Sequence, residues 1–193
     1  MSAAAPDALA GRGDWMITAS GRRFYPLDPR PEDISIADIA HHLARLCRYG
    51  GAVEGWYSVA EHSVLLAEHF AGRGERRLAK WALLHDAAEA YINDLIRPVK
   101  PAVIGFKPIE IRIEGVIWPM FELYGGLPPE VKEADTAIVG DERQQLFTAQ
   151  ALKASRWKAR PGLGVTCRQL ERDDARLAFL DCYDWLFLGA RRP

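Results

Sequence analysis

A histidine and an acid stand side by side inside a helix-forming stretch, Trp81–Leu95, which is rich in Ala, Leu and Glu. The polar groups of this stretch that could take part in chemistry are His85, Asp86, Glu89 and Asp94. Residues four apart share one face of a helix, so His85 and Glu89 are expected to lie together. Charged groups in an apolar helix are costly unless something cationic satisfies them. A divalent metal ion would do so.

Two further groups could join this pair. His62 lies in Ala60-Glu61-His62-Ser63, and Asp135 lies in Glu133-Ala134-Asp135-Thr136. Two imidazoles and two carboxylates suit a divalent ion and leave positions open for water. Residue types alone do not select the ion, so Mn, Co, Zn, Fe, Ni and Mg all stay open. Such an ion lowers the pKa of its water and polarises a phosphoryl oxygen.

The elements that must position these groups are expected to be helices. Apolar residues recur at helical spacing, and Gly or Pro follows most of the periodic segments. Ser58-Val59-Ala60-Glu61 is a capping box, in which Ser58 accepts from a backbone amide and Glu61 reaches back. The predicted helices cover about 35–49, 58–70, 76–93, 108–124, 130–152 and 169–188.

An N-terminal hairpin precedes the helices, because Ser20-Gly21 separates two β-forming runs within residues 14–27. A lone hairpin is marginal, so it is expected to pack on the helical body. The predicted fold class is all-α, a helical bundle with a short N-terminal β-hairpin. Residues 1–13 are expected to be a disordered lead-in. Residues 14–193 are expected to form a single domain with a hairpin (14–27), a helical core (34–152) and a C-terminal helix (169–188).

Composition narrows the class of protein. The 193 residues include 25 basic and 26 acidic side chains, a balance that argues against binding duplex nucleic acid. The three cysteines are scattered, so a disulfide framework is not expected and a reducing compartment is favoured. The first residues lack the apolar run of a signal peptide or membrane span. We therefore expect a cytoplasmic protein with no membrane partner.

The order His62, then His85-Asp86, then Asp135 resembles that of the HD superfamily of metal-dependent phosphohydrolases, over roughly residues 34–150. Longer matches resemble its bacterial 5′-deoxynucleotidase branch: Ala60-Glu61-His62-Ser63, His85-Asp86-Ala87-Ala88-Glu89, Asp94-Leu95, Pro98-Val99-Lys100, Lys132-Glu133-Ala134-Asp135 and Arg48-Tyr49. The hairpin and the segment Asp38–Leu43 are also similar to phage and bacterial relatives that hydrolyse deoxynucleoside triphosphates, particularly dATP.

The resemblance implies an HD-domain bundle and a role for each matched residue. The metal ligands would be His62, His85, Asp86 and Asp135. Glu89 would be the general base or acid, and Asp94 would orient the nucleophile. Phosphate or sugar would be held by Arg48, Arg97 and Lys100.

The implied function is hydrolysis of a small nucleotide substrate, as a 5′-deoxynucleotidase acting on a phosphomonoester. Two alternatives stay open: a dNTP (dATP) triphosphohydrolase and a non-catalytic metal- or nucleotide-binding regulatory module. HD nucleotidases are often dimers, so a homodimer through the apolar last helix is one expectation, and an internal role for that face is the other.

Simpler roles compete for several side chains. The site itself could be a buried salt-bridged network, and Arg97 and Lys100 could be solvated loop charges. Asp141 and Glu142 are expected to face solvent or cap a neighbour. Trp157 is expected in the core. His41, His42 and His69 are expected to be structural.

Overall fold

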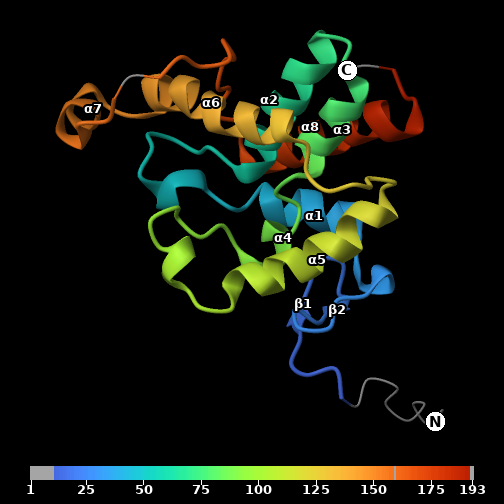
Figure 1. Ribbon diagram of the computed structural model, residues 1–193. Helices are drawn as coiled ribbons and strands as arrows, with labels where there is room; N and C mark the ends of the chain where they lie inside the picture. The colour runs from blue at the N-terminus through green and yellow to red at the C-terminus, as the bar shows by residue number, and fades with distance from the viewer. Residues whose placement is uncertain (1–10, 159, 192–193) are drawn as a thin grey trace.

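The computed structural model describes residues 11–158 and 160–191, and this part of the chain is mainly helical (Figure 1). The helices are α1 (Ile36–Leu43), α2 (Val59–Gly72), α3 (Arg76–Leu84), α4 (Glu89–Ile92), α5 (Phe106–Met120), α6 (Pro129–Leu146), α7 (Ala149–Ser155) and α8 (Arg172–Tyr183). Short 3-10 helices lie at η1 (Pro31–Asp33), η2 (Arg48–Gly51) and η3 (Lys100–Ala102), and a π-helical turn, η4 (Asp184–Leu188), follows α8. None of the described helices combines the length and apolar character needed to cross a bilayer.

A two-stranded antiparallel hairpin precedes the helices, as predicted. Strands β1 (Met16–Ile17) and β2 (Arg23–Phe24) pair with Met16 opposite Phe24. The buried Asp38 of α1 holds the turn, because its carboxylate accepts from the Ser20 amide and hydroxyl, both at 2.7 Å. The Phe24 ring stacks on Tyr91 at 3.9 Å, so the hairpin packs on the helical body as expected.

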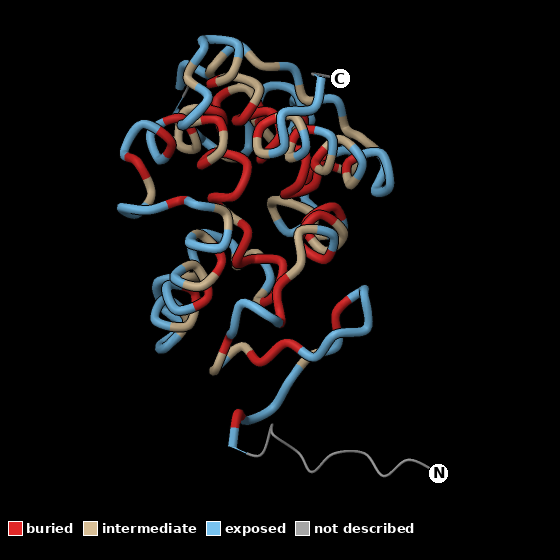
Figure 2. The backbone as a smooth tube through the Cα atoms, turned by 90° about the vertical axis from the view of Figure 1, so that its right-hand side faces the viewer, coloured by how far each residue is buried: buried red, intermediate tan, exposed pale blue. Residues whose placement is uncertain are grey.

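Helix α2 is the centre of the core. It packs mainly on α3 and α8, and most of its residues are buried. Figure 2 shows the buried residues, in red, gathered inside the helical body and the exposed ones, in pale blue, around its outside. Its N-terminus is capped as the sequence predicts, with Ser58 Oγ accepting from the Glu61 amide at 3.1 Å. Glu61 does not reach back, however. Its buried carboxylate instead accepts three backbone amides from residues 168–170, at 2.5 to 2.9 Å.

The helix predicted over 76–93 is broken in the middle, which corrects the expectation of one continuous helix. α3 ends at Leu84, residues 85–88 form a turn, and α4 begins at Glu89. Amides in this stretch bond three residues back, as Ala87 does to the Leu84 carbonyl at 3.2 Å. In this turn the His85 ring bonds the Ala82 carbonyl. The break in the helix therefore includes both residues of the His85-Asp86 pair.

Both ends of the described chain differ from simple expectation. Residues 1–10 of the expected lead-in lie outside the described residues, and Arg12 already pairs with Asp28 and Asp33. The last helix begins at Arg172, and the face it buries carries Ala175, Phe179 and Cys182. Leu177 of α8 and Leu188 of η4, by contrast, are 48% and 69% exposed.

Candidate metal centre

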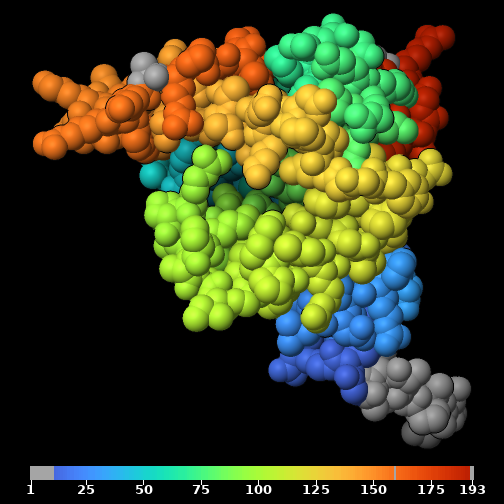
Figure 3. Space-filling view, viewed as in Figure 1, coloured from blue at the N-terminus to red at the C-terminus, as the bar shows by residue number. Residues whose placement is uncertain are grey.

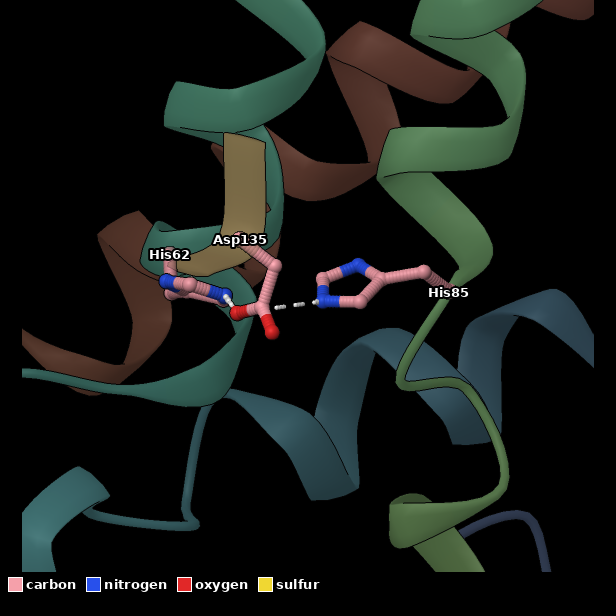
Figure 4. Close-up of side chains that lie close together, drawn as sticks. All are labelled: His62, His85 and Asp135. Carbon is pink, nitrogen blue, oxygen red and sulfur yellow. Dashed lines mark ion pairs between the residues drawn. The ribbon is translucent and has the colours of Figure 1, made fainter. Parts of the chain in front are cut away.

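Three elements bring the four predicted ligands together. His62 comes from α2, His85 and Asp86 from the turn after α3, and Asp135 from α6. Ligand atoms of His62, His85 and Asp135 lie within 4.8 Å of one another. Figure 4 shows the Asp135 carboxylate between the two imidazoles, with Oδ1 at 3.2 Å from His62 Nε2 and 3.9 Å from His85 Nε2. Asp86 Oδ2 adds a fourth group, 3.1 Å from His85 Nε2 and 4.0 Å from His62 Nε2.

Each imidazole is oriented through its Nδ1 atom. His62 Nδ1 bonds Glu142 Oε1 at 2.7 Å, and His85 Nδ1 bonds the Ala82 carbonyl at 2.7 Å. Both Nε2 atoms are buried and make no hydrogen bond. Metal-binding histidines are typically held this way, with the second ring nitrogen fixed by a carboxylate or carbonyl. The donor set and the two unsatisfied nitrogens therefore fit a divalent ion.

Glu142 lies directly behind His62 at the candidate site, and the sequence prediction placed it wrongly. Instead of facing solvent it is fully buried, and it accepts from Tyr57 Oη at 2.9 Å and from Tyr49 Oη, besides His62. The Arg48 guanidinium lies 3.5 Å from its Oε1. Burial raises the pKa of Glu142, but Arg48 and then His62 outweigh burial and hold the pKa well below its usual value. Glu142 is thus a permanent anion behind His62.

Asp141, the neighbour of Glu142, also has a partner. Its carboxylate accepts the amides of Leu163 and Gly164, which fixes the loop after α7 onto α6. Gly140 lets that loop approach, since a Cβ there would lie 2.7 Å from the Arg160 carbonyl oxygen.

The charges at the centre are strongly coupled. Burial lowers the pKa of His85, but the Asp86 carboxylate outweighs it and raises the pKa to about 9. Burial raises the pKa of Asp135, and the two imidazoles reverse this and hold it well below its usual value. A cation bound here would take the place of a proton on the imidazoles, because metal binding displaces ligand protons.

The centre forms one wall of a pocket of about 550 Å³. Figure 3 shows the surface hollowed between α6 (yellow-orange) and the segment before η3 (lime green). The predicted catalytic residues Glu89 and Asp94 line this pocket, as do all three predicted substrate-binding cations. Burial is the main cause that raises the pKa of both acids.

The three cations differ in how they are held. Arg48 is mostly buried, with Nη1 at 3.8 Å from Asp86 Oδ2. Lys100 Nζ lies 3.5 Å from Glu89 Oε1 and 2.7 Å from Glu110 Oε1, a partner that the sequence prediction missed. Arg97 is 72% exposed and only approaches Asp135, at 4.0 Å. Seven of the nine predicted site residues thus line one pocket, and the other two, His62 and His85, lie behind it against Asp135 and Asp86. Arg97 is the most loosely placed of the nine.

Trp157, expected in the core, instead lines the outer part of the pocket and is 42% exposed. Its position on the loop after α7 explains the error, because nothing in the local sequence relates that loop to the pocket.

Comparison with known proteins places the chain among bacterial relatives. No model of a known protein family matches the sequence. The chain is 40% identical over 181 residues to "Uncharacterized protein RCAP_rcc00048" of Rhodobacter capsulatus, covering 86% of this chain and 91% of that protein. It is 38% identical over 133 residues to "Uncharacterized protein YfdR" of Escherichia coli, covering 67% of this chain and 70% of that protein. The chain therefore belongs to the family that includes these two proteins.

Proposed function

We propose that this protein is a divalent-metal-dependent phosphohydrolase of the HD superfamily that hydrolyses the phosphomonoester of a small deoxynucleotide. One observation carries the proposal. Two buried imidazole Nε2 atoms without hydrogen bonds face two carboxylates on the wall of a pocket that also holds Glu89 and three cations. The nearest carboxylate oxygens lie 3.1 and 3.2 Å from these nitrogens without hydrogen-bond geometry, and a cation held between the imidazoles and the carboxylates would satisfy both sets of groups.

His62, His85, Asp86 and Asp135 would hold the ion. When bound, it would supply Lewis acidity toward a phosphoryl oxygen and a nucleophile at neutral pH. Glu89 would move the proton. Burial and then the Asp86 carboxylate keep the pKa of Glu89 well above its usual value, which favours its protonated form. Lys100, fixed by Glu110, stands at Glu89 and could neutralise developing phosphate charge.

The charge of the pocket favours a monophosphate over a triphosphate. Four carboxylates and four cations line the pocket, and two of these cations, Arg48 and Lys100, are also paired with Glu142 and Glu110 behind it, so a divalent ion would leave a formal charge of at most about +2. A phosphomonoester carries about −1.5 to −2 at neutral pH and would balance that charge. A triphosphate brings more negative charge than these groups offset. The homodimer and the cytoplasmic location stay predictions of the same proposal.

The test uses metal-stripped protein supplied separately with Mn, Co, Zn or Mg and incubated with each dNMP and dNTP, with products resolved by chromatography. We expect nucleoside and phosphate from a dNMP. Nucleoside and triphosphate from a dNTP would move the protein to the triphosphohydrolase alternative. Bound metal and bound nucleotide with no product under any ion would overturn the enzyme proposal and favour a regulatory module.

A further inference from the structure

The pocket changes character along α6. Asp135, Val139 and Arg143 all line it and lie four residues apart. At about 1.5 Å per residue, Arg143 is roughly 12 Å along the helix axis from the candidate ligand Asp135. The pocket is therefore polar at the metal centre, apolar one turn further on, and cationic and aromatic two turns away.

An ordered aromatic group stands at this outer end. The Arg143 guanidinium lies over the Trp157 ring, with Cζ 4.1 Å from the ring centroid. Phe147 meets the indole edge-on at 5.2 Å, and Tyr49 meets Phe147 edge-on at 5.2 Å. In the described part of the chain, the Nε atom of Arg143 is buried without a hydrogen bond. The indole is thus held in place by two neighbours while 42% of the residue stays open.

A second tryptophan shows that packing under an arginine is not by itself a sign of a ligand. Trp15 at the hairpin lies under Arg23 at 4.7 Å and is 48% exposed. Trp157 lines the pocket that contains the candidate metal centre, and Trp15 is not among the residues that line it. The position of Trp157, and not its exposure, distinguishes the two.

We propose that Trp157, backed by Arg143, is the platform on which the base of the nucleotide stacks while the phosphate lies at the metal centre. The inference rests on the proposed function and makes the substrate class nucleotides instead of baseless sugar phosphates. An aromatic ring stacks on the π-face of any base, so Trp157 selects for the presence of a base and not for its identity. Trp157 would be a specificity residue that touches substrate, with no part in proton transfer.

The experiment compares the four dNMPs with 2-deoxyribose 5-phosphate, which lacks a base, using the metal-loaded protein. Trp157→Ala should raise KM for the dNMPs about 5- to 150-fold, the range for loss of one base–aromatic stack, and change kcat less than about twofold. KM for 2-deoxyribose 5-phosphate should not change. Trp157→Phe should keep most of the dNMP affinity, and Trp15→Ala, the matched exposed tryptophan under an arginine, should behave as wild type.

Unchanged dNMP kinetics in Trp157→Ala would overturn the inference, as would an equal loss on the baseless substrate. If the wild type hydrolyses neither substrate, the proposed function fails, and calorimetry of each dNMP on the metal-stripped protein then decides about the platform. Binding that is lost in Trp157→Ala and kept in Trp15→Ala retains it. Binding that is absent, or the same in both variants, removes it.

Discussion

Two histidines in different regions of the molecule, His42 and His85, each bond a backbone carbonyl through Nδ1, but their Nε2 atoms have different surroundings. His42, between the hairpin and α4, bonds the Ala90 carbonyl through Nδ1 at 2.7 Å and accepts the Ala19 amide at Nε2, 3.1 Å away. His85 bonds the Ala82 carbonyl through Nδ1 at the same distance, but its buried Nε2 makes no hydrogen bond and faces the Asp86 and Asp135 carboxylates, at 3.1 and 3.9 Å. A structural histidine has hydrogen bonds at both ring nitrogens. A metal-binding histidine has a hydrogen bond at one ring nitrogen and keeps the other for the ion.

The largest effect on metal binding and turnover is expected from replacing His85, whose Nε2 makes no hydrogen bond. His85→Ala should lose bound metal and lower turnover at least about 1000-fold, because the Lewis acid contributes several kcal/mol to the transition state. Metal content by mass spectrometry and initial rates check this. A variant that keeps stoichiometric metal would contradict the assignment of His85 as a ligand.

The next effect separates holding the ion from moving protons. Glu89→Ala should keep metal and lower kcat about 100- to 10,000-fold, the usual contribution of a general acid or base. Metal titration and kinetics on the same preparation distinguish this outcome from that of His85→Ala. Turnover equal to wild type would remove Glu89 from the proton-transfer role.

A smaller effect on metal affinity is expected from replacing Glu142, which bonds the candidate ligand His62. Glu142→Gln removes the anion that orients His62 and should weaken metal affinity about 10- to 100-fold. Glu61→Gln is the matched control, since Glu61 is equally buried but bonds only the amides of residues 168–170 in the described structure. If both variants lose the same metal affinity, general destabilisation accounts for the result and the orienting role fails.

The smallest effect on activity is expected from replacing His42, both of whose ring nitrogens make hydrogen bonds. His42→Ala leaves the Ala90 carbonyl and the Ala19 amide without their side-chain partner, and should lower the free energy of unfolding by about 1–3 kcal/mol. Metal content and kcat should stay within about twofold of wild type. Urea denaturation measures the first and the standard assay the second. Loss of metal in this variant would end the comparison on which these predictions rest.

The features of the fold and of the candidate site that the sequence predicted are those encoded by short patterns of residues. The hairpin turn at Gly21 and the Ser58 cap each depend on a few neighbouring residues, and both are confirmed. The groups around the pocket came from motif spacing, and the structure brings them together. Their roles as ligands and catalysts stay predictions.

The parts that the sequence did not predict depend on distant partners. Glu142 lies in a polar stretch of α6 that resembles a solvated face, and its donors Tyr57 and His62 are 85 and 80 residues away. The break at His85 lies in a stretch of strong helix formers, where tertiary packing overrides local propensity. The second half of the Ser58 capping box failed because Glu61 found amides more than 100 residues later in the chain.

That last contact has a consequence for the order in which the molecule assembles during synthesis. The four candidate ligands all precede residue 136, but the amides that satisfy Glu61, next to His62, come from residues 168–170. Until the ribosome has released that segment, α2 cannot bury its N-terminal carboxylate without leaving it unpaired. We therefore expect nascent chains shorter than about 170 residues to stay sensitive to protease and to bind metal poorly. Folding of this chain would then be completed late, by a contact of high sequence separation that makes the ligand helix stable.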